Sequence, residues 1–220
     1  MTDIDPTQFA SLLCSRLCHD MLSPVGALSN GLELMRDEQD PEMRERCMEL
    51  LEQSAATSTA KLKFFRLAFG AAGGYGDRVP VDEPQGLIAA LLAGNDRIRL
   101  NWAISESQLP KPAVKVLLNL AQLAIDALVR GGDLDIGVEG RDGATEIAVR
   151  ATGPKIAFDR AIGAALDGTM AVAELSSRTA AAHMVNLTAQ QTGGGVQYMM
   201  TDDTLVLGAV LPGADDGMIG

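Results

Sequence analysis

The sequence has few positive charges for its length. Its 220 residues include 18 lysines and arginines against 29 aspartates and glutamates, which gives a net charge of −11. A surface of that charge repels the phosphates of nucleic acids and the headgroups of anionic lipids. We therefore expect no nucleic-acid partner and no role at a membrane surface.

Long apolar runs and disulfide-forming cysteines are also scarce. The sequence contains no stretch of about 18 uncharged apolar residues, the length needed to cross a bilayer. Its opening, MTDIDPTQFA, lacks the basic start and apolar centre of a signal peptide. The three cysteines, Cys14, Cys18 and Cys47, are an odd number, which fits a reducing compartment better than a set of disulfides. We expect a soluble cytoplasmic protein.

The two cysteines before His19 raise the question of a metal site, and their spacing disfavours one. Cys14 and Cys18 share a helix face, but His19 points about 100° away from Cys18, and no fourth ligand is nearby. We interpret the cysteines as small buried thiols and predict no metal site.

The first third of the chain has the pattern of two long helices. Apolar residues recur at every third or fourth position over residues 8–36, and again from Pro41 to Phe69. Asp40 is a good N-cap and Pro41 a good first-turn residue for the second helix. Each helix would be about 40 Å long at 1.5 Å per residue. An isolated hairpin would leave apolar side chains in water, so residues 1–72 predict a homodimer through a four-helix bundle.

A glycine-rich linker, GAAGGYGDRVP, separates this hairpin from a second domain at residues 78–214. Helical and strand patterns alternate there, which predicts an α/β sandwich. The expected helices cover 83–94, 110–132 and 178–195, and the expected strands lie at 97–105, within 133–153 and within 195–212.

The most distinctive stretch of the hairpin is LCHDMLSPVGAL, residues 17–28. Imidazole can act as a neutral nucleophile near pH 7, and the carboxylate of Asp20 beside His19 can accept the proton of one ring nitrogen. Pro24 has no amide hydrogen, so it removes the helical hydrogen bond to the carbonyl of Asp20 and should bend the helix near His19. From these residues alone, His19 is equally well a nucleophile or an ordinary exposed histidine beside a tolerated kink.

In its context CHDMLSPVGAL resembles the H-box of sensor histidine kinases, a histidine and an acid followed by a proline in the first helix of a hairpin. The domain that follows resembles the ATP-binding domain of those kinases, and the resemblance covers about residues 8–212. It implies a Bergerat-like α/β sandwich after the dimeric bundle, and it makes His19 the phosphorylated residue.

The nucleotide-binding boxes depart from the kinase pattern. In VLLNLAQLAIDAL, Asn119 matches the first asparagine of the kinase N-box, but Leu123 stands where the metal ligand is expected and has no oxygen for Mg²⁺. In ATGPKI, Ala151 replaces the adenine-binding aspartate and Lys155 replaces a glycine. In SRTAAAHMV the three phosphate-loop glycines are replaced by Ser177, Thr179 and Ala181. The resemblance therefore implies a degenerate domain that binds no ATP.

A kinase-like dimer with a histidine and no ATP site is similar to the histidine phosphotransferases of bacterial phosphorelays, of the ChpT type. That resemblance implies that His19 accepts a phosphoryl group from the aspartate of one receiver domain and passes it to another, with Asp20 orienting the ring. It implies no cofactor of the protein's own and Mg²⁺ supplied by the receiver. The implied partners are a second copy, the receiver of a hybrid histidine kinase and response regulators. The expected receiver-binding residues are Arg16, Leu22, Ser23, Gly26 and Asn30.

Two alternatives stay open at this point. The protein could be a non-catalytic adaptor for receivers, or a phosphatase that removes their phosphate. We interpret His183 as a partly buried structural histidine, Asn119 and Asp126 as capping or surface residues, and Trp102 as a core residue.

Overall fold

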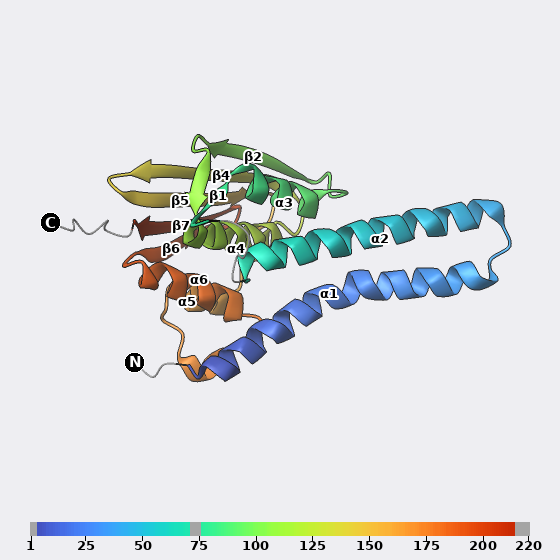
Figure 1. The fold of residues 1–220 in the computed structure, drawn as a ribbon, viewed down its shortest axis with the longest axis horizontal. Helices are drawn as coiled ribbons and strands as arrows, with labels where there is room; N and C mark the ends of the chain where they lie inside the picture. Colours follow the sequence, from blue (N-terminus) through green and yellow to red (C-terminus); the bar gives the residue numbers. More distant parts are fainter. Residues whose placement is uncertain (1–3, 71–75, 214–220) are drawn as a thin grey trace.

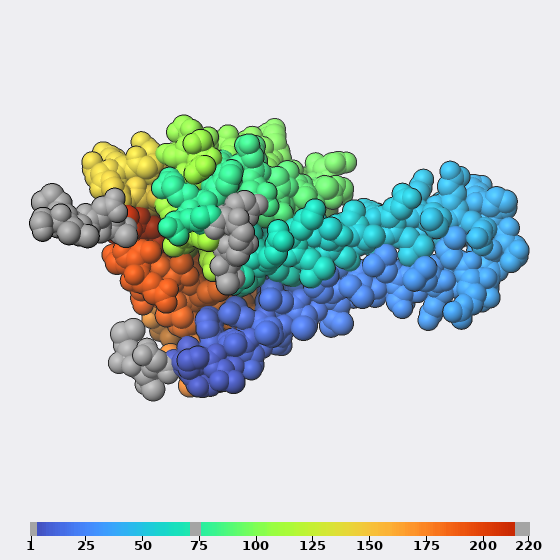
Figure 2. All heavy atoms as spheres, viewed as in Figure 1, coloured from blue at the N-terminus to red at the C-terminus, as the bar shows by residue number. Residues whose placement is uncertain are grey.

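A computed structural model describes residues 4–70 and 76–213 of the chain. Figure 1 shows a long helical hairpin that projects from an α/β domain, and Figure 2 shows how far its tip lies from that domain. Residues 71–75 of the predicted glycine-rich linker lie outside the described residues, as do the outer ends of the two predicted domains. The last three residues of the predicted linker form a strand, β1 (Arg78–Pro80).

The hairpin consists of α1 (Pro6–Asp37) and α2 (Pro41–Ala68). Asp5 caps α1 by accepting a hydrogen bond from the amide of Gln8 at 2.9 Å, and Asp40 caps α2 through the amide of Glu42 at 3.2 Å. Each helix opens with a proline, where the missing amide costs no helical bond. The predicted helices and the turn between them are confirmed.

The two helices approach closely at Gly31, which is buried on α1. A Cβ atom there would lie 2.8 Å from a terminal carbon of Leu51 on α2. Glycine thus lets the Leu51 side chain pack directly against the α1 backbone. Pro24 is also buried, and Figure 1 shows α1 changing direction along its length, as expected of a helix with an internal proline.

The α/β domain contains a mixed five-stranded sheet in the order β2-β4-β5-β7-β6. Its strands are β2 (Ile98–Ile104), β4 (Gly132–Arg141), β5 (Ala144–Thr152), β6 (Gly195–Met200) and β7 (Thr204–Pro212). Only the β2–β4 pair is parallel among these strands. The β4–β5 turn contains Asp142 and Gly143, both with positive φ, so the predicted hairpin is confirmed.

Helices cover one face of this sheet and build the core. They are α3 (Asp82–Leu92), α4 (Lys111–Ala127) and α6 (Ala180–Gln191), and α4 packs against β4, β5 and β7. Along β4 the buried side chains are Leu134, Ile136 and Val138, which alternate with residues of the opposite face. Trp102 packs against the core as expected.

Three kinds of short element were not predicted. They are a two-stranded sheet of β1 (Arg78–Pro80) with β3 (Gln108–Pro110), helix α5 (Arg160–Leu166), and a single 3₁₀ turn at Val172–Glu174. Each is too short to show a clear hydrophobic period in the sequence.

The cysteines are placed differently from our interpretation. Cys47 is buried as expected, but Cys14 and Cys18 are exposed, so the prediction of buried thiols is wrong for these two. In the described part of the chain, no helix combines the length and the apolar character needed to span a membrane.

The end of α2 belongs to the core of the α/β domain. Phe64 and Ala68 are fully buried where α2 packs against α3 and α4, and the same hydrophobic cluster continues through the sheet to Leu211. The hairpin is therefore anchored by the packing of its last two turns.

The anchor predicts a large effect of one substitution. Phe64→Ala should lower the free energy of unfolding by about 3–5 kcal/mol, because it empties a fully buried aromatic site. The measurement is denaturant unfolding followed by circular dichroism. Lys63→Ala, at the adjacent exposed position, is the control and should change the value by less than about 0.5 kcal/mol. Equal effects of the two substitutions would contradict the anchor.

Candidate phosphotransfer site

His19 lies on the surface of α1, at the level of the α/β domain, and 83% of its side chain is exposed. Its Nδ1 atom is 3.4 Å from Oδ1 of Asp20, a long contact for a hydrogen bond. When Nδ1 carries the ring proton and donates a hydrogen bond to Asp20, the lone pair on Nε2 is free. The arrangement therefore presents one ring nitrogen to whatever docks on α1.

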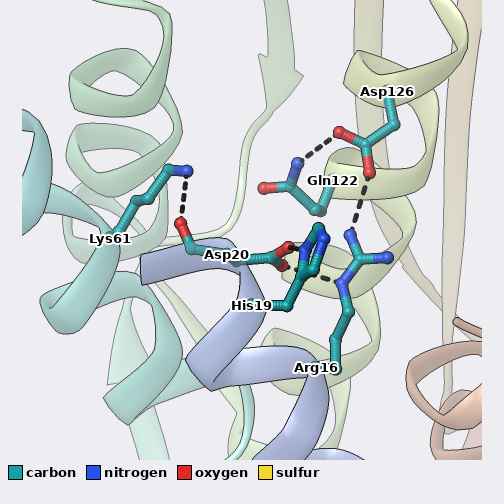
Figure 3. A network of polar contacts seen from close by, with 6 residues as sticks. All are labelled: Arg16, His19, Asp20, Lys61, Gln122 and Asp126. Atoms are coloured by element: carbon teal, nitrogen blue, oxygen red, sulfur yellow. Dashed lines mark hydrogen bonds and ion pairs between the residues drawn. The ribbon is translucent and has the colours of Figure 1, made fainter. Parts of the chain in front are cut away.

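Asp20 is held in place by a chain of ionic contacts that reaches the α/β domain, shown in Figure 3. Arg16 Nε is 2.7 Å from Asp20 Oδ2, one helical turn away, and Arg16 Nη2 is 3.3 Å from Oδ2 of Asp126 on α4. The other oxygen of Asp126 accepts a hydrogen bond from Gln122 Nε2 at 2.8 Å. Residues of α4 thus fix Arg16, Arg16 fixes Asp20, and Asp20 contacts the ring of His19.

Asp126 is the acid that the local environment perturbs most in this network. Desolvation beside α1 raises the pKa of its carboxyl, while the Gln122 amide and the Arg16 guanidinium oppose that effect. About half of the Asp126 side chain remains exposed, so water screens much of the desolvation. The Gln122 amide and the Arg16 guanidinium are thus the polar groups that offset the loss of hydration at this carboxyl.

The backbone of Asp20 is also engaged, because Lys61 of α2 donates a hydrogen bond from Nζ to its carbonyl oxygen at 2.9 Å. Lys61, Gln122 and the part played by Asp126 were not predicted from the sequence. The one available signal was Pro24, which leaves the Asp20 carbonyl without its helical donor. The sequence did not reveal which residue of the second helix lies opposite.

The residues expected to bind a receiver lie along the outside of α1. Leu22 is 70% exposed, Ser23 and Asn30 are exposed, and a Cβ at Gly26 would meet open space. Arg16 differs from them, since its guanidinium is already bonded to Asp20 and Asp126. The surface beside His19 is therefore exposed, and it combines small side chains with one large apolar one.

The segments that correspond to the nucleotide boxes are partly packed into the core, although Lys155 is exposed. Leu123 and Ala151 are buried, and so is Asn119, whose side-chain amide donates to the carbonyls of Lys115 at 2.8 Å and Ala68 at 3.3 Å. Ala68 is the last residue of α2, so the capping role expected for Asn119 is confirmed.

His183 lies on α6 against the first turns of α1. Its ring meets that of Phe9 edge to face, with centroids 5.6 Å apart. Burial lowers the pKa of His183 below its ordinary value of 6.5, because the charged form loses hydration. The prediction of a partly buried structural histidine is confirmed, and α6 holds the N-terminal end of α1.

Metal ligands do not gather around either histidine. Within residues 4–70 and 76–213, no group of three or more His, Cys, Asp and Glu side chains is placed to hold a metal ion.

Comparison with known proteins places the chain in a family. A protein-family model described as "Histidine phosphotransferase C-terminal domain" matches residues 81–204, more than half of the chain. The chain belongs to the histidine phosphotransferase family. The matched residues lie in the α/β domain, so the family model does not include His19.

Two similar proteins extend this family assignment. Protein phosphotransferase ChpT of Brucella abortus (strain 2308) is 41% identical over 132 residues, which are 60% of this chain and 61% of that protein. The chain therefore spans about three fifths of the length of this curated relative. The 1.7 Å structure of a bacterial phosphotransferase matches with 28% identity and a TM-score of 0.82, covering 94% of this chain and 98% of that chain. The predicted resemblance to the ChpT type is confirmed, and so is the predicted architecture of a long helical hairpin followed by an α/β domain.

Histidine kinases are more distant matches. The kinase AdeS of Acinetobacter baumannii is 12% identical with a TM-score of 0.48, over 88% of this chain and 97% of that chain.

The contact between His183 and α1 predicts that the free energy of unfolding of this histidine phosphotransferase family member depends on pH. The pKa of His183 is lower in the folded protein, so its stabilising contribution is complete above the ordinary value of 6.5 and is lost as the pH falls below it. Between about pH 7.5 and 5.5, the wild type should lose more unfolding free energy than His183→Gln, which cannot titrate. Chemical denaturation at both pH values measures this, and equal losses in the two proteins would contradict it.

Proposed function

We propose that this protein is a phosphorelay histidine phosphotransferase that carries a phosphoryl group on His19. The observation that carries the proposal is the exposed imidazole whose Nδ1 faces Asp20 and whose Nε2 is open to a partner. Membership of the histidine phosphotransferase family and the 41% sequence identity to ChpT of Brucella abortus over 132 residues support the same activity.

The chemistry follows from the state of the ring. The Nε2 lone pair attacks the phosphorus of a receiver's aspartyl phosphate, the N–P bond forms, and the P–O bond to the aspartate breaks and leaves a carboxylate. The ring, which keeps its proton on Nδ1, becomes cationic, and the adjacent Asp20 carboxylate stabilises that charge. Transfer to a second receiver reverses these steps. The Mg²⁺ that neutralises the phosphoryl oxygens belongs to the receiver in this proposal.

The receiver docks, in our proposal, on the outer surface of α1 next to His19. Leu22 supplies an apolar contact, and the small side chains of Ser23 and Gly26 allow close approach. Asn30 lies further along the same surface and contributes hydrogen-bonding groups. Arg16 borders this surface while bridging Asp20 and Asp126, so it contributes charge and keeps the site in shape.

The protein needs no ATP in this proposal. Leu123 occupies the expected position of a Mg²⁺ ligand and is buried, and Ala151 has no carboxylate for an adenine. The segment in place of the phosphate loop leads into α6, which packs against α1 through His183 and Phe9. The former nucleotide domain thus supports the helix that carries the histidine.

Replacement of His19 separates phosphotransfer from the adaptor alternative. Wild type and His183→Gln should gain an acid-labile, alkali-stable label from a ³²P-phosphorylated receiver domain, and His19→Ala should gain none. Radiolabelled ATP alone should label none of the three. An adaptor would leave the wild type unlabelled, a phosphatase would release free phosphate without a stable label, and self-labelling by ATP would show a kinase.

We also propose that two copies pair through the hairpin as a four-helix bundle. Large apolar side chains are exposed along it, including Leu32 at 63%, Leu50 at 58% and Leu62 at 57%. An apolar surface of this extent on a projecting hairpin is typical of an interface.

The dimer predicts the behaviour of an α2 variant. The wild type should have twice the chain mass in solution, because pairing removes the exposed leucines from water. Leu50→Glu should shift it to the monomer, whereas Glu49→Gln, at the next position, should leave the dimer intact. Multi-angle light scattering measures both, and a monomeric wild type at micromolar concentration would contradict the dimer.

A further inference from the structure

The helix that carries His19 has a gap in its hydrogen bonding one residue after the histidine. The amide of residue 24 would normally donate to the carbonyl of Asp20, but Pro24 has no amide hydrogen. The site of this carbonyl is part-buried, so water has only limited access to it. A carbonyl in such a place is costly without a donor, and the fold supplies one.

The second helix supplies it. Lys61 Nζ lies 2.9 Å from the Asp20 carbonyl oxygen, in a part-buried contact between residues 41 positions apart. The bond is charge-assisted, because an ammonium donates to a backbone oxygen, and such bonds are stronger than neutral ones. It joins α2 to the turn of α1 that carries His19 and Asp20, as Figure 3 shows.

The contact complements the one made by Arg16. Arg16 holds the carboxylate of Asp20 from the side of the α/β domain, and Lys61 holds its carbonyl from the side of α2. Asp20 is therefore fixed at both its backbone and its side chain. A shift of this turn would change the Nδ1 contact of His19, which depends on where Asp20 lies.

We propose that Lys61 is a positioning residue: it replaces the amide that Pro24 lacks and holds the Asp20 turn so that His19 presents its free nitrogen. The inference deepens the proposed phosphotransfer on His19 and rests on it for its effect on rate. The replacement of the missing Pro24 amide by Lys61 is a property of the unphosphorylated protein, so it can be tested without any receiver.

The test is a double-substitution cycle. Lys61→Met removes the donor and keeps the length of the side chain, and Pro24→Ala restores the backbone amide. Lys63→Met, at an exposed lysine two residues along α2, is the matched control, and Lys61→Arg keeps a donor. The readouts are amide hydrogen exchange over residues 20–28 in the free protein, and the rate at which a phosphorylated receiver labels His19.

Lys61→Met should speed exchange and slow labelling by roughly tenfold each, the usual consequence of losing a hydrogen bond from a charged donor. In the Pro24→Ala background the same substitution should change neither, because the new amide satisfies the Asp20 carbonyl. Lys61→Arg and Lys63→Met should behave like the wild type. If Lys61 stabilised the hairpin in another way, Lys61→Met would have the same effect with and without the restored amide at position 24.

The outcomes separate the two proposals. Equal effects of Lys61→Met in both backgrounds, or no effect on exchange in either, would overturn the role of Lys61. Wild-type labelling rates for Lys61→Met would also overturn it and leave phosphotransfer standing. Coupled exchange effects in a protein whose His19 is never labelled would overturn the proposed function while the contact itself stands.

Discussion

The last turns of α2 lie inside the hydrophobic core of the α/β domain, and the placement of every group around His19 depends on this packing. Phe64 and Ala68 fix α2 against α3 and α4, and the Asn119 side chain caps the end of the helix. With α2 fixed, Lys61 faces the Asp20 turn of α1. The same packing brings α4 close enough for Asp126 to meet Arg16. A surface histidine thereby acquires a defined setting from residues in three helices.

The segments that replace the nucleotide boxes of kinases have a mechanical role in this fold. Where a kinase domain must keep space for a nucleotide, this chain buries Leu123 and packs α6 on the first turns of α1. Two contacts then tie α1 to the domain, one through His183 and one through Arg16. These two contacts place the segment of α1 that contains His19 at a defined position on the α/β domain.

Much of this structure was predictable, because it follows from patterns of residues that are close together in the sequence. The hairpin follows from a helical period interrupted by Asp40 and Pro41, and the sheet follows from alternating strands and turn residues. The contacts of Asp20 were only half predictable. The adjacent His19 and the missing amide of Pro24 are local, whereas Lys61 and Asp126 are brought near by the register of one helix on another. The sequence does not encode that register in any short-range signal. The exposed Cys14 and Cys18 were mispredicted for a similar reason, since the face that a helix buries depends on its neighbours.

The exposure of His19 has a consequence for time as well as for access. A phosphorylated ring at an 83% exposed position would stand in bulk water, so hydrolysis would compete with every transfer. The lifetime of the intermediate would be governed by how soon the next receiver arrives. If His19 carries the phosphoryl group as proposed, a site so exposed would favour passing the group on over sheltering it.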